Sequence, residues 1–235
     1  GILLITEGVF GMDGEQGIIK EICALKKKYE FRILIDDAHG FGYMGPTGAG
    51  ADEAQGCQKD IDLYFSSMVK SLGSLGGFIC GPKAVIKYLR YNTRSQIFAK
   101  SMPLMVVEGM LKRMDMIKTM PELREKLWYN VNKLQTGLKE RGFDIGGTNS
   151  PVTPIFMKGD VPEATQMVMD LRENYHIFCS IVVYPVIPKG DIIYRLIPTA
   201  AHSDADIDET LKAFEETKKK LDAGVYKAVD IPDMA

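Results

Sequence analysis

The chain has 235 residues, 46% of them hydrophobic, which is enough to bury the core of one large domain or two small ones. Its 29 Lys and Arg residues nearly balance its 31 Asp and Glu residues, and the formal net charge is -2. This balance argues against a nucleic-acid partner or a polybasic membrane surface. The four cysteines form no C-x-x-C pair and no metal-site spacing, which favours reduced thiols in a cytoplasmic protein without a metal.

No segment is apolar over the roughly 20 residues that a membrane-spanning helix needs. The best candidate, residues 177–187, is shorter and contains Pro185. The chain starts directly on the apolar residues 2–5, without an initiator methionine or a signal peptide. We therefore expect the sequence to be a piece of a longer protein without a transmembrane segment.

The first half of the chain alternates between two kinds of pattern. Short apolar segments predict strands at residues 2–6, 31–36, 63–67 and 77–80. Apolar residues at helical spacing predict a helix over residues 17–29, and a second helix is expected at 85–91. Unbroken apolar strands that alternate with helices indicate an α/β fold with a mostly parallel sheet.

The second half is richer in helices. Residues 104–118 and 121–141 predict two long helices, followed by a strand at 152–157 and a helix at 162–174. Strands are expected at 177–184 and 192–197, and Ser203 with Asp206 three residues later predicts the start of a last helix. The sequence therefore predicts two domains, an α/β part at 1–120 and a smaller α+β domain at 121–235.

Three chemically useful side chains follow predicted strands. Asp36 and His39 come at the end of the strand at 31–36, and Lys70 follows the next strand, before the small-residue loop 71–77. Ligands of open α/β sheets bind at this edge. A lysine there can form a Schiff base with an aldehyde cofactor, and an aspartate can keep a pyridine nitrogen protonated.

Each residue alone has a plainer interpretation: Lys70 as a surface lysine, Asp36 as a turn residue that competes with Asp37, and His39 as a structural histidine. The combination is what favours a pyridine cofactor. Residues 40–45 fit the dinucleotide motif G-x-G-x-x-G, but residues 46–50 are poor helix material, so we reject that interpretation. His176 and His202 are interpreted as structural or surface residues.

Four segments resemble the pyridoxal phosphate (PLP)-dependent α-oxoamine synthases: residues 6–14, 35–42, 67–70 and 194–202. These fold-type I enzymes condense an amino acid with an acyl-CoA and release carbon dioxide. The motifs follow the order and spacing of the family over nearly the whole chain. The resemblance implies the C-terminal part of the large PLP-binding domain, followed by the small α+β domain.

The resemblance also implies roles for single residues. Lys70 matches the lysine that bonds to the cofactor and acts as the base, Asp36 the partner of the pyridine nitrogen, and His39 the histidine beside the phenolic oxygen. Ser67 occupies the position of a phosphate ligand. Arg195 matches the arginine that binds the substrate carboxylate, a task that suits its bidentate geometry.

Two positions depart from the family pattern. Gly11 stands where many members have serine, and Lys100 occupies the position of a hydroxyl residue that reaches the phosphate of the neighbouring subunit. The family's N-terminal part, which supplies a glycine-bearing phosphate loop and a stacking histidine, is absent from this sequence. We therefore expect residues 1–235 alone to bind PLP poorly and to be inactive.

Residues 96–100 and 184–190 are most similar to bacterial serine palmitoyltransferases. We therefore expect a homodimer, with its active site at the subunit interface, that joins L-serine to palmitoyl-CoA and gives 3-oxosphinganine for sphingolipid biosynthesis. Glycine C-acetyltransferase and 8-amino-7-oxononanoate synthase activities are the alternatives within the family. A catalytically incompetent fragment or scaffold subunit is the alternative outside it, although the presence of Lys70 argues against a scaffold subunit. The acyl-chain length stays open.

Overall fold

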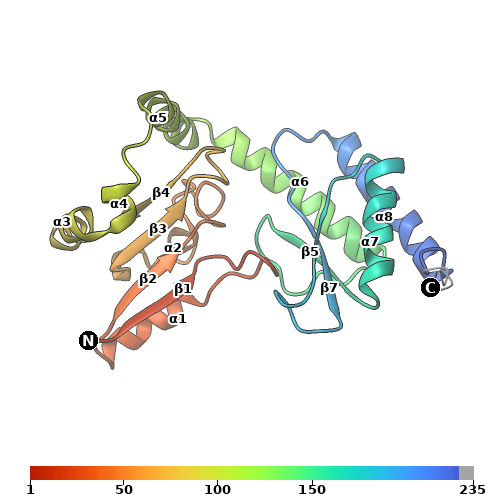
Figure 1. The fold of residues 1–235 in the computed structure, drawn as a ribbon, viewed down its shortest axis with the longest axis horizontal. Helices are drawn as coiled ribbons and strands as arrows, with labels where there is room; N and C mark the ends of the chain where they lie inside the picture. The colour runs from red at the N-terminus through yellow and green to blue at the C-terminus, as the bar shows by residue number, and fades with distance from the viewer. Residues whose placement is uncertain (228–235) are drawn as a thin grey trace, which may run out of the picture. The chain divides into compact units, whose positions relative to one another are not determined.

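A computed structural model describes residues 1–227 of the chain. These residues divide into two compact units. The first comprises residues 1–11 and 15–124, and the second comprises residues 12–14 and the described residues from 125 onward. Both units contain helices and strands, as Figure 1 shows, so the predicted mixed α/β class is confirmed.

The sheet of the first unit has four strands in the order β1-β2-β3-β4. They are β1 (Leu3–Glu7), β2 (Arg32–Asp36), β3 (Leu63–Ser67) and β4 (Gly77–Cys80) (Figure 1). β1, β2 and β3 run parallel, which confirms a mostly parallel sheet, whereas β4 pairs antiparallel with β3. The loop 68–76 explains the reversal, because a short connection joins antiparallel strands and parallel strands need a longer crossover.

The helices of the first unit are mostly short. They are α1 (Ile19–Ala24), η1 (Leu25–Lys27), α2 (Ala51–Ala54), η2 (Gln58–Asp60), α3 (Lys83–Asn92), α4 (Arg94–Phe98) and α5 (Leu104–Thr119). The helix predicted over 17–29 begins two residues later, because the N–H of Gly17 donates to the carbonyl of Gly8, and it ends in the 3-10 turn η1. No sequence pattern predicted α2 and α4, which are too short to show a helical period.

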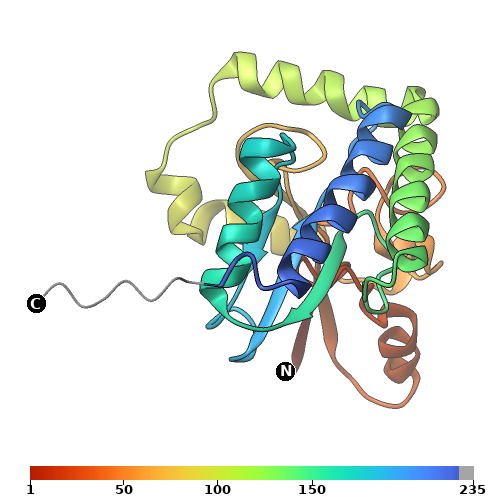
Figure 2. The same ribbon diagram turned by 90° about the vertical axis from the view of Figure 1, so that its right-hand side faces the viewer.

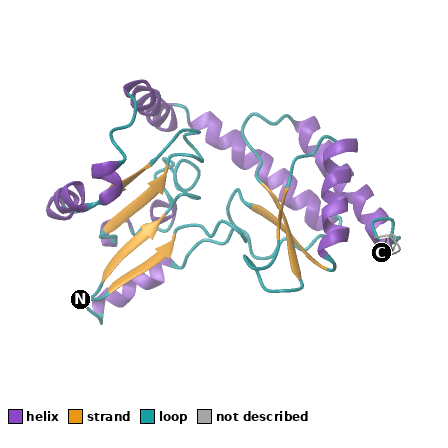
Figure 3. Cartoon of the chain, in the orientation of Figure 1, coloured by secondary structure: helices purple, strands orange, loops and turns teal. Residues whose placement is uncertain are grey.

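Burial in the first unit is greatest at β2. Ile33 and Ile35 of this strand are fully buried, whereas Leu3 and Ile5 of the edge strand β1 are 50% and 66% exposed. A second cluster forms where Met68 and Leu72, from the loop after β3, pack with Met110 of α5. Figure 3 shows these orange strands and the purple helices that accompany them. The loop after β3 is therefore anchored by its own apolar side chains.

The second unit has a three-stranded antiparallel sheet in the order β5-β7-β6. Its strands are β5 (Thr153–Lys158), β6 (Ser180–Val182) and β7 (Asp191–Leu196), and its helices are α7 (Val161–Asn174) and α8 (Asp204–Asp222) together with most of α6 (Pro121–Glu140). The three helices, seen in Figure 2, share one apolar core with β5 and β7. Tyr194 and Phe214 are fully buried in it and meet edge to face.

One predicted strand is much shorter than expected. The segment 177–184 forms only β6, because the chain first closes α7: His176 takes a left-handed φ of 59°, and the N–H of Ile177 donates to the carbonyl of Leu171. Pro185, which lacks an N–H, follows the strand closely. The predicted start of α8 is confirmed, since Ser203 and Asp206 make both bonds of a capping box.

Within residues 1–227, no helix combines the length and the apolar character required to cross a bilayer. The same part of the chain holds no group of three or more His, Cys, Asp or Glu residues arranged to bind a metal ion. The four cysteines are free, and three of them, Cys23, Cys57 and Cys179, are buried.

Candidate active site

The candidate site lies where β2 and β3 end. These two strands are parallel, with Asp36 opposite Phe65, so both of them end at the same edge of the sheet. Asp36 is the last residue of β2, Ser67 is the last residue of β3, and Lys70 follows three residues later. The structure therefore places a carboxylate, a hydroxyl group and an amine at one edge of the first sheet, where ligands of such folds bind.

A short turn holds the carboxylate of Asp36. One of its oxygens, Oδ1, accepts a hydrogen bond of 3.0 Å from the backbone N–H of Ala38. The side chain is half-buried at the strand end. This bond fixes the orientation of the carboxylate and leaves its other oxygen for an external donor.

His39 packs against Glu7 and Gly11, two contacts that the sequence did not predict. Its Nδ1 lies 4.0 Å from Oε2 of Glu7, the last residue of β1, and its imidazole is 21% exposed. A Cβ on Gly11 would overlap the imidazole, so the backbone of Gly11 lies directly against the ring. Glu7 has the same signal as Asp36, a carboxylate at the end of a strand, and could have been identified from it.

The loop after β3 positions Ser67 and Lys70. The hydroxyl of Ser67 accepts a bond of 3.3 Å from the N–H of Val69, and the carbonyl of Lys70 accepts one of 3.0 Å from Gly73. The N–H of Met68 donates to Gly76, which pins the base of the loop. Among residues 1–227, the ammonium group of Lys70 has no hydrogen-bond partner, so it is available to a ligand.

Asp37, next to Asp36, is the buried carboxyl group of this region. It is fully buried, and its Oδ2 accepts bonds from the N–H of Ala51 at 2.9 Å and the hydroxyl of Tyr64 at 2.8 Å. Burial raises the pKa of Asp37 to about 7, against the opposing effect of these two bonds. Asp37 therefore faces the interior of the first unit, whereas Asp36 is half-buried at the strand end.

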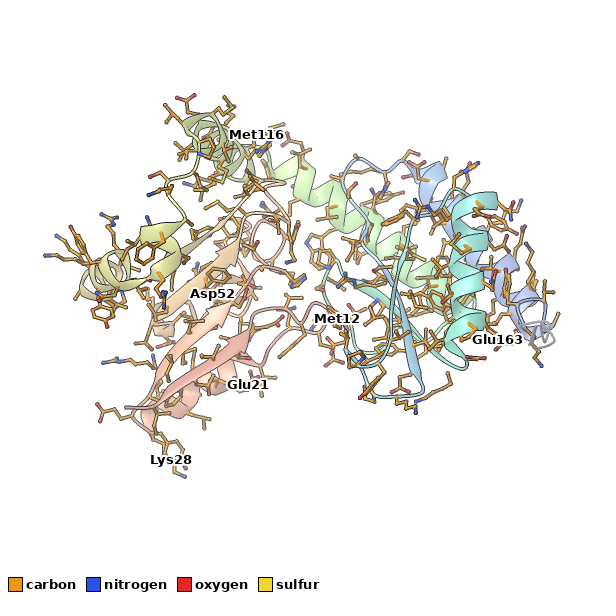
Figure 4. All side chains as sticks on the ribbon, in the orientation of Figure 1. Met12, Glu21, Lys28, Asp52, Met116 and Glu163 are labelled. Atoms are coloured by element: carbon orange, nitrogen blue, oxygen red, sulfur yellow. The ribbon has the colours of Figure 1, made fainter. Side chains whose placement is uncertain are left out.

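The two remaining predicted site residues lie elsewhere in the chain. Lys100 is exposed on the loop between α4 and α5, with a φ of 69°. Arg195 belongs to the second unit, on the central strand β7, and its Nη1 lies 3.8 Å from the sulfur of Met12 (Figure 4 labels Met12). The roles of all six residues stay predictions.

A profile of the aminotransferase class I and II family matches residues 1–214. The chain belongs to this family. A cysteate-C-fatty acyltransferase from Capnocytophaga ochracea is 62% identical over 230 residues, which are 98% of this chain and 55% of that protein. A serine palmitoyltransferase from Bacteriovorax stolpii is 36% identical over 221 residues, 94% of this chain and 52% of that protein. An 8-amino-7-oxononanoate synthase from Petrotoga mobilis is also 36% identical, over 93% of this chain and 55% of that protein.

Solved structures of α-oxoamine synthases are also similar to this chain. A serine palmitoyltransferase from S. paucimobilis, with PLP and myriocin bound, has a TM-score of 0.88 and 30% identity over 94% of this chain and 56% of that one. A serine palmitoyltransferase with PLP has the same TM-score and 31% identity, over 94% of this chain and 55% of that one. The predicted resemblance to PLP-dependent α-oxoamine synthases is therefore confirmed, and PLP is the cofactor of this fold family. The chain spans about half the length of the relatives it matches.

Proposed function

We propose that the full-length protein is a PLP-dependent α-oxoamine synthase, which joins an amino acid to a fatty acyl thioester and releases carbon dioxide. The observation that carries this proposal is the set of groups at the ends of β2 and β3. Asp36, His39, Ser67 and Lys70 offer a carboxylate, an imidazole, a hydroxyl group and an amine at one edge of the sheet. This donor set fits a pyridine ring that carries an aldehyde and a phosphate.

Each group of the set has one proposed partner on PLP. The amine of Lys70 would bond to the aldehyde carbon, the carboxylate of Asp36 would pair with the ring nitrogen, and His39 would interact with the phenolic oxygen. Ser67 would bind the phosphate, and Lys100 of a neighbouring subunit would supply a further positive charge to it. When bound, the cofactor supplies an electron sink for the charge that develops on the substrate's α-carbon.

The remaining steps belong to the side chains of this chain. The carboxylate of Asp36 would accept a hydrogen bond from the ring nitrogen of the cofactor and so help to hold that nitrogen protonated. Lys70 would act as the base that takes the proton from the α-carbon of the amino acid. Arg195 holds the substrate carboxylate with two parallel hydrogen bonds and so fixes the orientation of the reacting bonds.

The amino acid substrate is proposed by similarity. The relative with 62% identity is named a cysteate-C-fatty acyltransferase, whereas the serine palmitoyltransferase and the 8-amino-7-oxononanoate synthase reach 36%. We therefore place cysteate first. L-serine with palmitoyl-CoA, the prediction from the sequence, is the second candidate, and the serine palmitoyltransferase structures with TM-scores of 0.88 support it.

A homodimer is part of the proposal. Helices α3 to α5 expose large apolar side chains that a second subunit could cover: Val85, Tyr88, Tyr91, Phe98, Leu104 and Met105. An apolar surface of this kind is typical of a protein interface. A cytoplasmic location stays a prediction.

The test is a substrate panel for the full-length protein purified with PLP. Cysteate, serine, glycine and alanine are each supplied with palmitoyl-CoA, acetyl-CoA or pimeloyl-CoA, and release of free CoA and of carbon dioxide is measured. We expect turnover with cysteate or serine and palmitoyl-CoA, with cysteate preferred. A preference for glycine with acetyl-CoA, or for alanine with pimeloyl-CoA, would overturn the fatty acyl assignment. A protein that loads PLP and turns over none of these pairs would overturn the synthase proposal.

A further inference from the structure

Three glycines enclose the carboxyl group of Asp37. They come from three segments: Gly8 follows β1, Gly40 follows β2, and Gly50 precedes α2. A Cβ at any of the three would overlap an oxygen of this carboxyl group. Within the described residues, its Oδ1 is buried and has no hydrogen-bond donor. The carboxyl group of Asp37 therefore lies in a confined space, and one of its two oxygens accepts no hydrogen bond from residues 1–227. Both conditions disfavour the ionised form of Asp37.

The hydrogen bonds of Tyr64 point to the same conclusion. Its hydroxyl lies 2.8 Å from Oδ2 of Asp37 and 3.1 Å from the carbonyl of Ala49. A tyrosine hydroxyl carries one proton and can donate to only one of these oxygens. If Asp37 carries a proton, it donates to Tyr64, and Tyr64 then donates to Ala49. With a neutral Asp37, both the Asp37–Tyr64 contact and the Tyr64–Ala49 contact are hydrogen bonds. With an ionised Asp37, only one of these two contacts has a hydrogen atom.

The charged surroundings of Asp37 are also negative. Desolvation is the largest effect that raises its pKa to about 7, and the charges of Asp52 on α2 and of the adjacent Asp36 add to it. Figure 4 labels Asp52 among the side chains of the first unit. The other groups that contact Asp37 are Tyr64 on β3, the backbone of Ala51, and the glycines after β1 and β2, which carry no charge.

We propose that Asp37 is a positioning residue that acts as a neutral carboxylic acid, so that it adds no negative charge next to Asp36 at the cofactor site. Asp37 joins three segments. Its N–H donates to Phe65 of β3 at 2.8 Å, its carbonyl accepts from Gly40 at 3.0 Å, and its side chain holds Ala51. His39 lies in the turn that the Gly40–Asp37 bond closes, and β3 leads to Lys70. The link to the cofactor rests on the proposed function, whereas the protonation of Asp37 does not.

The sign of the pH effect follows from linkage. The pKa of Asp37 is raised from 3.8 in the unfolded chain to about 7 in the folded protein. Between these values the unfolded chain has lost a proton that the folded protein keeps, so stability falls as the pH rises through this range. Above about 7 Asp37 is ionised, and the hydroxyl of Tyr64 turns from the carbonyl of Ala49 to the new anion, so β3, which leads to Lys70, loses its bond to Ala49.

The experiment compares the full-length protein with Asp37→Asn. Infrared difference spectroscopy across pH about 5 to about 9 records the carbonyl band of a protonated carboxyl group, and PLP affinity and the unfolding midpoint are measured over the same range. We expect a band in the wild type that disappears with a midpoint near 7, and a PLP affinity that falls by up to about tenfold per pH unit above it. Asp37→Asn should lack this band and this step, yet bind PLP like the wild type at low pH.

Two further variants keep the test decisive. Asp52→Asn is the matched control, because Asp52 is a buried carboxyl group close by whose pKa is also raised by burial. If Asp52→Asn removes the step and Asp37→Asn retains it, the proposal is wrong. Tyr64→Phe removes the hydroxyl group that bonds Oδ2 of Asp37, so the midpoint of the step should shift, and an unchanged midpoint would contradict the proposal even if Asp37→Asn does not fold.

Failure of this proposal can be told apart from failure of the proposed function. A wild-type protein that binds no PLP would refute the proposed function, but the infrared band and the pH dependence of unfolding would still report the proton on Asp37. A wild type that binds PLP with no protonated carboxyl band at pH about 6 would refute the role of Asp37 and leave the proposed function intact.

Discussion

Gly11 and His39 show how closely the backbone approaches the candidate site. The imidazole lies against the Cα of Gly11, and any Cβ there would overlap it. Many α-oxoamine synthases have serine at this position, so the departure noted from the sequence has a steric meaning in this chain. The missing side chain leaves room for the ring to lie 4.0 Å from Glu7.

Gly11→Ser should therefore displace the His39 ring. Forcing a side chain into a filled space costs about 1–3 kcal/mol, which would weaken PLP binding about tenfold or more if His39 contacts the cofactor. Fluorescence titration of the full-length protein with PLP measures the change. Gly109→Ala is the control, since a Cβ there meets only the end of Arg113 at 3.6 Å. Unchanged PLP affinity in Gly11→Ser would mean that PLP binding does not depend on the present position of the His39 ring.

Lys70→Ala should remove the visible absorbance that a Schiff base gives to PLP enzymes, because no amine remains at the strand end. Loss of both the covalent bond and the base should lower kcat by a factor of about 10² to 10⁴. Absorbance spectra and steady-state kinetics of the full-length protein measure the two effects. Lys83→Ala, a change on the exposed start of α3, is the control and should behave like the wild type. A normal spectrum in Lys70→Ala would rule out this lysine.

At the scale of elements, the start of α8 has a clear local cause. The hydroxyl of Ser203 accepts from the N–H of Asp206, and the carboxylate of Asp206 accepts from the N–H of Ser203. The helix then buries Ile207, Leu211 and Phe214 in the core of the second unit. A local sequence signal thus fixes where a core helix begins.

Ser203→Ala should lower the free energy of unfolding by about 1 kcal/mol, because it leaves one N–H of the first turn without a partner. Ser203→Thr keeps the hydroxyl group and should lose much less. Denaturant unfolding followed by circular dichroism measures both. Equal losses for the two variants would show that the hydroxyl bond contributes nothing.

The crossing of α6 and α8 depends on Gly137. A Cβ at this position would overlap Leu211 of α8. Gly137→Ala should therefore cost about 1–3 kcal/mol, although alanine is the better helix former. The double variant with Leu211→Ala should lose less free energy of unfolding than the sum of the two single losses, because the shorter side chain removes the overlap, and a double-mutant cycle measures this coupling. Additive losses would contradict a direct contact.

At the scale of the whole molecule, the described residues leave apolar surface uncovered. Leu3 and Ile5 of β1 are at least half exposed, as is Leu104 at the start of α5. The relatives are nearly twice as long as this chain, which supplies 52% to 55% of their length. Further chain, a second subunit, or both are proposed to cover this surface.

A full-length protein should therefore bind PLP more tightly than residues 1–235 alone. The sequence interpretation assigned a phosphate loop and a stacking histidine to the absent part, and losing several such contacts should cost at least about tenfold in affinity. Equilibrium titration with PLP compares the two chains, and sedimentation velocity reports their oligomeric states. Equal affinities would show that the present residues suffice.

Sequence patterns alone predicted the strands β3 and β4 correctly, the helices α5 and α6 to within a residue, and the position of Asp36 and Lys70 at or just after strand ends. These features depend on local patterns, namely apolar runs, helical spacing and capping residues. The division into domains near residue 120 and the roles of the site residues stay predictions.

Other features became visible only in the folded chain. The strand predicted at 177–184 is shortened by a hydrogen bond between residues six positions apart, from the N–H of Ile177 to the carbonyl of Leu171. The contrast between Asp36 and Asp37 has the same kind of cause. Both residues are aspartates, yet burial raises the pKa of Asp37, against the opposing hydrogen bonds from Ala51 and Tyr64 of distant segments. Burial and charge are properties of the assembled neighbourhood, and no local pattern encodes them.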